Sequence, residues 1–167
     1  MTSHLAVTTS EMFAALEIEA VLVPSPTAPA GTSEGARAFA ATIGYLGEGI
    51  RGALTLVADE PTVTSWLPRY CTQKADASDA IGEFANMALG RLKTRVLRDG
   101  LSFGLSTPKV APVHLGHVVE RDAASWLAFA AKGRRFWMKL DIELEPGFEP
   151  QAPPLEAPVE AGEALLF

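Results

Sequence analysis

The feature that most constrains the fold of this chain is an apolar repeat between about Asp76 and Arg98. Its hydrophobic members recur at intervals of three and four residues: Ile81, Phe84, Ala85, Ala88, Leu89, Leu92 and Val96. On an α-helix this spacing gathers them on one side, where they can face a core. Asp99-Gly100 follows, and a glycine at this point commonly ends a helix in the left-handed conformation. The sequence therefore predicts a long amphipathic helix with one buried face.

Runs of β-forming residues on both sides of this helix predict an antiparallel sheet. Residues 38–46 and 50–58 are apolar, and the turn Gly47-Glu48-Gly49 between them predicts a hairpin. After the long helix, four further runs predict consecutive antiparallel strands, at about 101–106, 109–120, 123–131 and 134–144. The turn Lys132-Gly133 is expected to join the last two of these strands as a second hairpin.

Two shorter helices are expected before the long one. Residues 9–19 have a short amphipathic pattern, with Thr9 or Ser10 as the N-cap. Pro61 suits the first turn of another short helix, which is interrupted near Pro68. Three helices together with a set of antiparallel strands predict the α+β class.

Length and composition predict one domain with a short tail. With 167 residues, of which 48% are hydrophobic and 20% charged, the chain can bury one ordinary core. Residues 146–167 differ, because they hold five prolines, four glutamates and no basic residue. Such a composition is typical of a segment that does not pack. The sequence therefore predicts a domain over residues 1–145 and a flexible acidic tail over residues 146–167.

Charge and cysteine content limit the partners and the compartment that we expect. The formal net charge of -6 argues against a sequence-independent nucleic-acid binder and against a binder of anionic membranes. The longest nearly apolar run, residues 123–131, is about half as long as a membrane span. Cys71 is the only cysteine and is interpreted as a buried filler, so nothing requires an oxidising compartment. These features predict a cytoplasmic protein.

A second stripe on the long helix carries polar residues. At about 100° per residue, Glu83, Asn86, Gly90 and Lys93 all fall within about 40° of Asp79, opposite the apolar face. In mid-helix Gly90 costs about 1 kcal/mol relative to alanine, but it leaves room for another molecule beside the Glu83 carboxylate and the Asn86 carboxamide. Such a pair can hold a lysine and orient a water molecule. A face that is merely solvated explains the same stripe, so helical geometry alone leaves both interpretations open.

The same segment resembles the signature of the CheC/CheX/FliY phosphatase family. In that signature an Asp or Ser is followed by Glu four residues later, by Asn three further on and by Pro about twenty-two further on; this chain has Asp79, Glu83, Asn86 and Pro108. Residues 86–93 are similar to the family's N-M-x-x-G-x-x-K stretch, and residues 43–56 resemble its hairpin. The single copy of the motif is closest to CheX-like proteins, and Pro108 is interpreted as structural.

The resemblance implies a phosphatase that hydrolyses the aspartyl phosphate of a CheY-like receiver domain. In this role Asn86 would orient the attacking water and Glu83 would contact a receiver lysine, while Asp79, Gly90 and Lys93 are candidate partner contacts. It also implies a long twisted antiparallel sheet with about three helices packed on it, and a homodimer formed through the sheet. No cofactor or metal of its own is expected, because the divalent cation, Mg, belongs to the receiver. A non-catalytic receiver-binding or flagellar-switch-type adaptor of the same fold is the alternative.

The remaining distinctive residues are interpreted as structural. His114 and His117 form an H-x-x-H pattern in an expected strand, where an odd spacing puts them on opposite faces and so does not predict a shared metal site. The three tryptophans are expected in a core or an interface: Trp66, Trp126 and Trp137.

Overall fold

The computed structural model describes residues 1–24, 37–67, 76–120 and 122–150. Within these residues, seven strands form one antiparallel sheet in the order β1-β6-β7-β3-β2-β4, and β5 also pairs with β2. The strands are β1 (Ala20–Val23), β2 (Ala38–Gly47), β3 (Ile50–Asp59), β4 (Phe103–Leu105), β5 (Lys109–Val113), β6 (Leu127–Ala131) and β7 (Arg134–Leu144). The helices are α1 (Thr2–Ala15), α2 (Glu60–Trp66), α3 (Ala77–Val96) and α4 (Leu115–Glu120), with short 3-10 helices η2 (Leu97–Asp99) and η3 (Ala123–Ser125). The predicted α+β class is confirmed.

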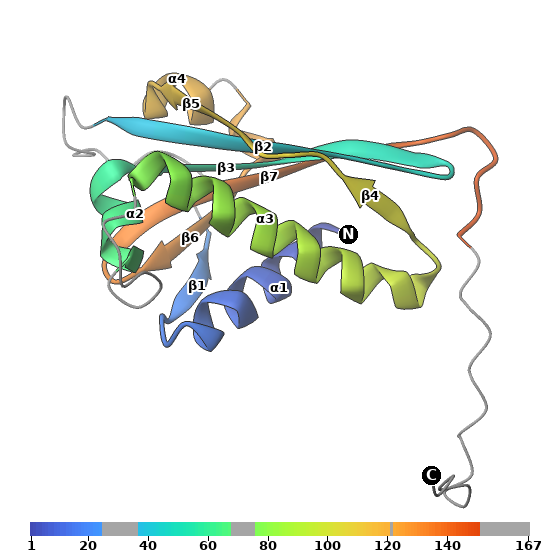
Figure 1. Cartoon of the computed structure of the whole chain (residues 1–167), viewed down its shortest axis with the longest axis horizontal. Helices are drawn as coiled ribbons and strands as arrows, with labels where there is room; N and C mark the ends of the chain where they lie inside the picture. Colours follow the sequence, from blue (N-terminus) through green and yellow to red (C-terminus); the bar gives the residue numbers. More distant parts are fainter. Residues whose placement is uncertain (25–36, 68–75, 121, 151–167) are drawn as a thin grey trace, which may run out of the picture.

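The sheet separates two unequal layers of helices (Figure 1). On one face, α1, α2 and α3 bury the main core of the protein. On the other face lies the short α4, where Val119 packs with Val57, Trp126 and Trp137 in a smaller cluster. All three tryptophans are therefore buried in cores, as the sequence predicts.

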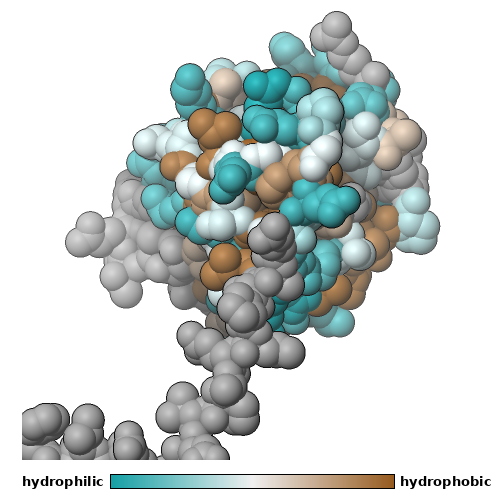
Figure 2. All heavy atoms as spheres, turned by 90° about the vertical axis from the view of Figure 1, so that its right-hand side faces the viewer, coloured by the Kyte–Doolittle hydropathy of each residue, from teal (hydrophilic) through white to brown (hydrophobic). Residues whose placement is uncertain are grey.

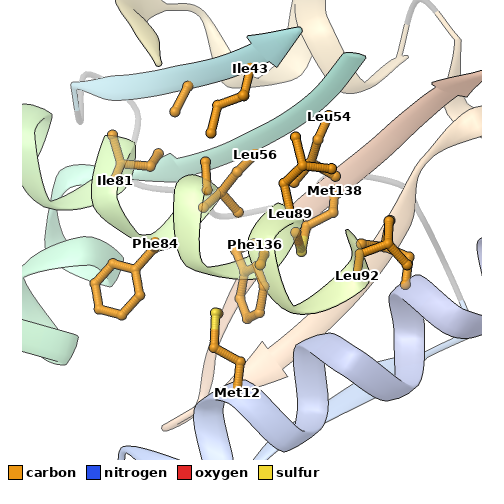
Figure 3. Close-up of a cluster of buried hydrophobic side chains, with 14 of the residues drawn as sticks. Met12, Ile43, Leu54, Leu56, Ile81, Phe84, Leu89, Leu92, Phe136 and Met138 are labelled. Atoms are coloured by element: carbon orange, nitrogen blue, oxygen red, sulfur yellow. The ribbon is translucent and has the colours of Figure 1, made fainter. Parts of the chain in front are cut away.

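The predicted long helix is confirmed as α3. The Asp76 carboxylate accepts a hydrogen bond from the Ser78 N–H at 3.4 Å at its start, and Gly100 adopts a left-handed φ of 80° after η2. Its apolar face points into the core between the sheet and α1, as Figure 3 shows for Ile81, Phe84, Leu89 and Leu92. These four side chains are fully buried, so the sheet and α1 together hold α3 in one position.

Both predicted hairpins are also confirmed. β2 and β3 pair over their whole length around Glu48-Gly49, so that Gly47 lies opposite Ile50. β6 and β7 turn at Lys132-Gly133, whose φ values of 48° and 73° are both positive. Two positive values in a two-residue turn match the right-handed twist of the strands that it joins.

The short helix predicted after β3 is confirmed as α2. Its N-cap is Asp59, the last residue of β3, whose carboxylate accepts a hydrogen bond from the Thr62 N–H at 2.8 Å. The predicted interruption near Pro68 lies outside the described residues, as do Cys71 and the tail beyond Pro150. Of the expected tail, residues 146–150 are described, and Phe148 packs against the main core.

The first helix begins earlier than the sequence predicts. α1 begins at Thr2, and Thr9 is not its N-cap but a fully buried residue within it. The Thr9 hydroxyl donates to the Leu5 carbonyl oxygen at 2.8 Å, which satisfies it inside the helix. Burial of Leu5, Met12 and Phe13 in the core thus outweighs the preference of threonine and serine for helix ends.

The prediction of consecutive strands over residues 109–131 is wrong in its middle part. β5 ends at Val113 and residues 115–120 form α4, because this segment turns back to cover the second face of the sheet with Val119. The prediction that His114 and His117 point to opposite faces is also wrong, since their ring centroids lie 5.7 Å apart. β4 and β5 both pair with β2, so they are not successive neighbours across the sheet.

Tyr45 is expected to make the stability of the fold depend on pH in the alkaline range. Its hydroxyl donates to the Asp141 carbonyl oxygen at 2.7 Å, and burial, helped by the Asp141 charge, raises the pKa of Tyr45 from 10.0 to about 12. The folded state therefore holds this proton more tightly than the unfolded state, and the stabilisation is complete below pH 10 and is lost as the pH rises through about 12. We expect urea unfolding to show a steeper alkaline loss of stability for the wild type than for Tyr45→Phe. Parallel curves for the two proteins would contradict this assignment.

Candidate functional site

The polar stripe predicted on the long helix lies on the exposed side of α3. Asp79, Glu83 and Asn86 are exposed, and Gly90 and Lys93 are partly exposed, whereas the apolar face of the same helix is buried in the core. Residues three and four apart on a helix are neighbours, with about 5–6 Å between Cβ atoms. The structure thus brings together a carboxylate and a carboxamide, Glu83 and Asn86, on one accessible surface.

The scaffold under this surface is rigid. Phe84 and Ala85, which lie between Glu83 and Asn86 in the sequence, are fully buried. The Phe84 ring stacks on Phe13 at 5.7 Å between centroids and meets Trp66 edge-on at 4.9 Å. A site on a packed helix keeps its geometry better than a site on a loop. Glu83 and Asn86 are therefore presented from a fixed backbone.

The connection between β4 and β5 lies directly beside this part of α3. A Cβ built at Gly82 would lie 3.2 Å from Cγ2 of Val110 and 3.6 Å from Cβ of Pro108. A side chain at this position would therefore push the Val110 side chain outward by a few tenths of an ångström, whereas glycine lets the start of β5 pack closely against the helix. The sequence analysis recognised Pro108 but missed Gly82 and Val110, although a second glycine in the middle of an amphipathic helix was a usable signal.

A hydrogen bond to a side chain holds the same connection against β2. The Gly44 N–H donates to Ser106 Oγ at 2.9 Å, and the Ser106 N–H donates to the Gly44 carbonyl oxygen at 2.9 Å. These two hydrogen bonds hold the connection to Gly44, which lies on β2 between the residues that pair with β4 and those that pair with β5. Pro108, which has no N–H to donate, lies just after the bridge. The segment from Ser106 to Val110 is thus fixed on both sides, by β2 and by α3.

Gly90 leaves open space on the stripe. A Cβ built there would meet no atom within 4 Å, so no described part of the chain requires a glycine at this position. The Thr94 hydroxyl, one turn further on, donates to the Gly90 carbonyl oxygen at 3.2 Å and so finds its partner within the helix. An unexplained glycine on an exposed helix face is consistent with a second molecule that approaches α3 at this point.

The described residues on and around this surface offer positioning groups and no metal cluster. Within residues 1–24, 37–67, 76–120 and 122–150, no group of three His, Cys, Asp or Glu side chains could hold a metal ion. No helix in these ranges is long and apolar enough to cross a membrane. What the surface can do is accept a hydrogen bond from a cation through Glu83 and both donate to and accept from a water or an oxyanion through Asn86.

The fold is that of CheX and CheC-like chemotaxis proteins. CheX from Vibrio vulnificus superposes with a TM-score of 0.65 at 15% identity, over 84% of this chain and 95% of that one. A CheC-like protein from Shewanella sp. PV-4 gives 0.62 at 16% identity, over 85% and 96% of the two chains. A chain of the CheX-CheY-BeF3-Mg complex from Borrelia burgdorferi gives 0.56 at 12% identity, over 85% and 97%. No curated protein sequence matches the chain.

The sequence itself identifies the family within this class. The model of the family described as Chemotaxis phosphatase CheX matches residues 39–124. This match extends from β2 to η3 and includes all of α3 and the connection between β4 and β5. The chain therefore belongs to the CheX family, and the resemblance noted from the motif is confirmed.

Proposed function

We propose that the chain hydrolyses the aspartyl phosphate of a CheY-like receiver domain, with Glu83 and Asn86 as its catalytic residues. The observation that carries this proposal is the pair itself: both side chains are exposed, one turn apart, on a helix face that Gly90 leaves open. Two comparisons support it. The family is described as a chemotaxis phosphatase, and a solved relative is a CheX-CheY complex. A receiver substrate also implies that the protein works in the cytoplasm.

The reaction requires little more than positioning. The Asn86 carboxamide holds a water in line with the bond between phosphorus and the receiver aspartate. The water oxygen bonds to phosphorus as that bond breaks, which leaves inorganic phosphate, a free aspartate carboxylate and a proton released to solvent. The Glu83 carboxylate binds a receiver lysine and so fixes the two proteins relative to each other. The divalent cation, Mg, is supplied by the receiver.

The other residues of the stripe make partner contacts in this proposal. Asp79, one turn before Glu83, and Lys93, two turns after Asn86, extend the contact along α3 with opposite charges. Charges at the edge of an interface chiefly influence association rate and orientation. Asp79 and Lys93 therefore serve docking and take no part in the chemical step.

The alternative is an adaptor that binds the receiver without hydrolysing it. Both functions predict binding, and only the phosphatase predicts turnover. The test is phosphate release from a receiver that is continuously charged by a small acyl phosphate, with catalytic amounts of wild type, of Glu83→Ala and of the matched control Glu120→Ala, which removes an exposed carboxylate from α4. Turnover by the wild type and the control, lost in Glu83→Ala, supports the phosphatase. Receiver binding without turnover in any sample supports the adaptor.

Substitutions at Gly90 should change the stability of the free protein and its affinity for a receiver in different ways. Because a Cβ at this position meets nothing, Gly90→Ala and Gly90→Gln should each stabilise the free protein by up to about 1 kcal/mol through helix propensity. The long glutamine side chain should nevertheless weaken binding of a receiver, since it fills the space that the partner enters. Urea unfolding and a receiver titration measure the two effects. Equal receiver affinities for Gly90→Gln and Gly90→Ala would show that the partner does not approach here.

The proposed homodimer has a specific candidate edge. β7 pairs with β6 only over Arg134–Met138, so on that side residues 139–144 face no strand among the described residues. Ile142 and Leu144 are 39% and 51% exposed there. An open edge with exposed apolar side chains is a template for a strand from a second copy. We expect a dimer by sedimentation and a shift toward monomer for Ile142→Lys, and an unshifted mass would exclude this edge.

A further inference from the structure

A basic groove lies between α1 and the C-terminal half of α3. Its volume is about 280 Å³, and its lining residues are Thr8, Glu11, Arg91, Thr94, Arg95 and Arg98. Three arginines against one glutamate make the groove positive, although the whole chain has a net charge of -6. The groove is distinct from the stripe of Glu83 and Asn86, because Arg91 and Arg95 project from another side of α3 and Arg98 lies beyond it in η2.

The charges of this groove are only partly neutralised. Arg95 donates two hydrogen bonds to the Glu11 carboxylate, at 2.8 and 3.0 Å. Arg91 and Arg98 are exposed and form no ion pair with any described residue. Arginine has a planar set of donors that suits carboxylates, so this pair can bind acidic side chains.

A buried hydroxyl supplies a second, independent observation. Thr8 lines the same groove and is only 1% exposed, yet its Oγ1 has no hydrogen-bond partner among the described residues. A buried polar atom without a partner costs free energy, and such atoms are rare in folded proteins. A rotation of the Thr8 side chain toward the groove would give this hydroxyl a polar ligand there.

The acidic end of the chain begins beside this groove. Glu149 and Phe148 line a cavity together with Gly100 and Ser102, and Gly100 lies only two residues after Arg98. Figure 2 views this end of the molecule, where hydrophilic residues surround separate hydrophobic ones. The seventeen residues 151–167 carry three glutamates and no basic residue. At about 3.3 Å per residue they can span about 56 Å, whereas Arg98 to Arg91 is about 10 Å along the helix.

We propose that the groove between α1 and α3 binds the chain's own residues 151–167 through the carboxylates of Glu156, Glu160 and Glu163. Charge complementarity, the starting point of the segment beside Arg98 and its length all favour this occupant. Thr94 belongs to the groove and is bonded to Gly90, so a docked segment borders the face that meets the receiver. This last consequence rests on the proposed function, whereas the docking itself does not.

The test uses the full chain and no receiver, so its result is independent of any phosphatase activity. A nitroxide is attached at Ala164→Cys in a Cys71→Ser background, and the amide signals of the folded protein are recorded by NMR. We expect strong broadening of Thr8, Glu11 and Thr94, with little effect at Arg134 on the distant β6-β7 turn. The broadening should weaken with added salt, because ion pairs at a surface are screened.

Charge reversal decides the result. Arg91→Glu combined with Arg98→Glu should abolish the broadening, whereas the control Arg134→Glu should leave it intact. Adding Glu156→Lys, Glu160→Lys and Glu163→Lys to the Arg91→Glu/Arg98→Glu chain should restore the broadening. Restoration excludes simple misfolding of the arginine variants. Absence of broadening in the starting protein, or broadening that survives the reversal, overturns the proposal. Broadening seen only between a labelled and an unlabelled chain overturns it in favour of docking between two copies.

Discussion

Asn86→Ala should lower phosphate release from a phosphorylated receiver by at least about 100-fold, the usual effect of removing one positioning or charge-stabilising group. Asn86 supplies the carboxamide that orients water in the proposed reaction, and alanine cannot replace it. The side chain is exposed and the backbone around it is held by Phe84 and Ala85, so the substitution should leave the fold intact. Receiver binding should persist, because Glu83 and the rest of the α3 surface remain. Phosphate release and a receiver titration measure the two effects.

The contact between Asn86 and the receiver can be measured directly by NMR. Asn86 is the only asparagine in the chain, so asparagine-selective ¹⁵N labelling gives one pair of side-chain amide signals. Addition of a receiver loaded with beryllium fluoride should shift these signals in the wild type and in Glu83→Ala. Asn86→Ala that retains turnover to within about threefold would show that water is oriented by another group. Unshifted amide signals in a complex that still forms would remove Asn86 from the interface.

Sequence periodicity was sufficient for the elements whose partners are close in the chain. α3 and the β2-β3 hairpin were predicted almost to the residue, because a period of 3.6 and a period of 2 each leave a clear apolar pattern. The β6-β7 turn was equally clear from Lys132-Gly133.

The elements that were missed depend on contacts between distant segments. Residues 115–120 have β-forming valines, yet they form α4 because Val119 and Trp126 together cover Trp137 on the second face of the sheet. Similarly, Thr9 was interpreted as a cap because its burial against Met138 of β7 cannot be read from local sequence. Tertiary burial decided both cases.

The candidate site also has features that the sequence predicts and features that depend on distant contacts. Helical spacing placed Glu83 and Asn86 on one face, and the structure shows that this face is exposed. Their roles came from the resemblance to a family, since the spacing alone is equally typical of a solvated helix. The approach of Pro108 and Val110 to Gly82 was missed: a mid-helix glycine indicates a close contact but does not identify its partner, which depends on how β4 and β5 share β2.

Phe84→Ala should destabilise the fold by about 3–5 kcal/mol, as is usual when a buried phenylalanine is truncated. Phe84 is fully buried and lies among the rings of Phe13 and Trp66, at 5.7 and 4.9 Å between centroids. The change removes the ring from the centre of this cluster and leaves a cavity, which the closely packed side chains around it can fill only in part. Since small domains are stable by only about 5–15 kcal/mol, much of the total would be lost. Urea unfolding of wild type and variant measures the difference.

The activity of Phe84→Ala should show whether Phe84 serves only the stability of the fold or also the proposed reaction. Phe84 lies next to Glu83 but faces the core, so the folded fraction of Phe84→Ala should still bind the receiver, with activity falling as the variant unfolds on heating. Leu97→Ala is the matched control, because Leu97 is 46% exposed just after α3 and its truncation should cost less than about 1 kcal/mol. Equal stability of Phe84→Ala and Leu97→Ala would contradict the packed cluster. Loss of activity in a fully folded Phe84→Ala would show instead that the ring fixes the position of Glu83 and Asn86.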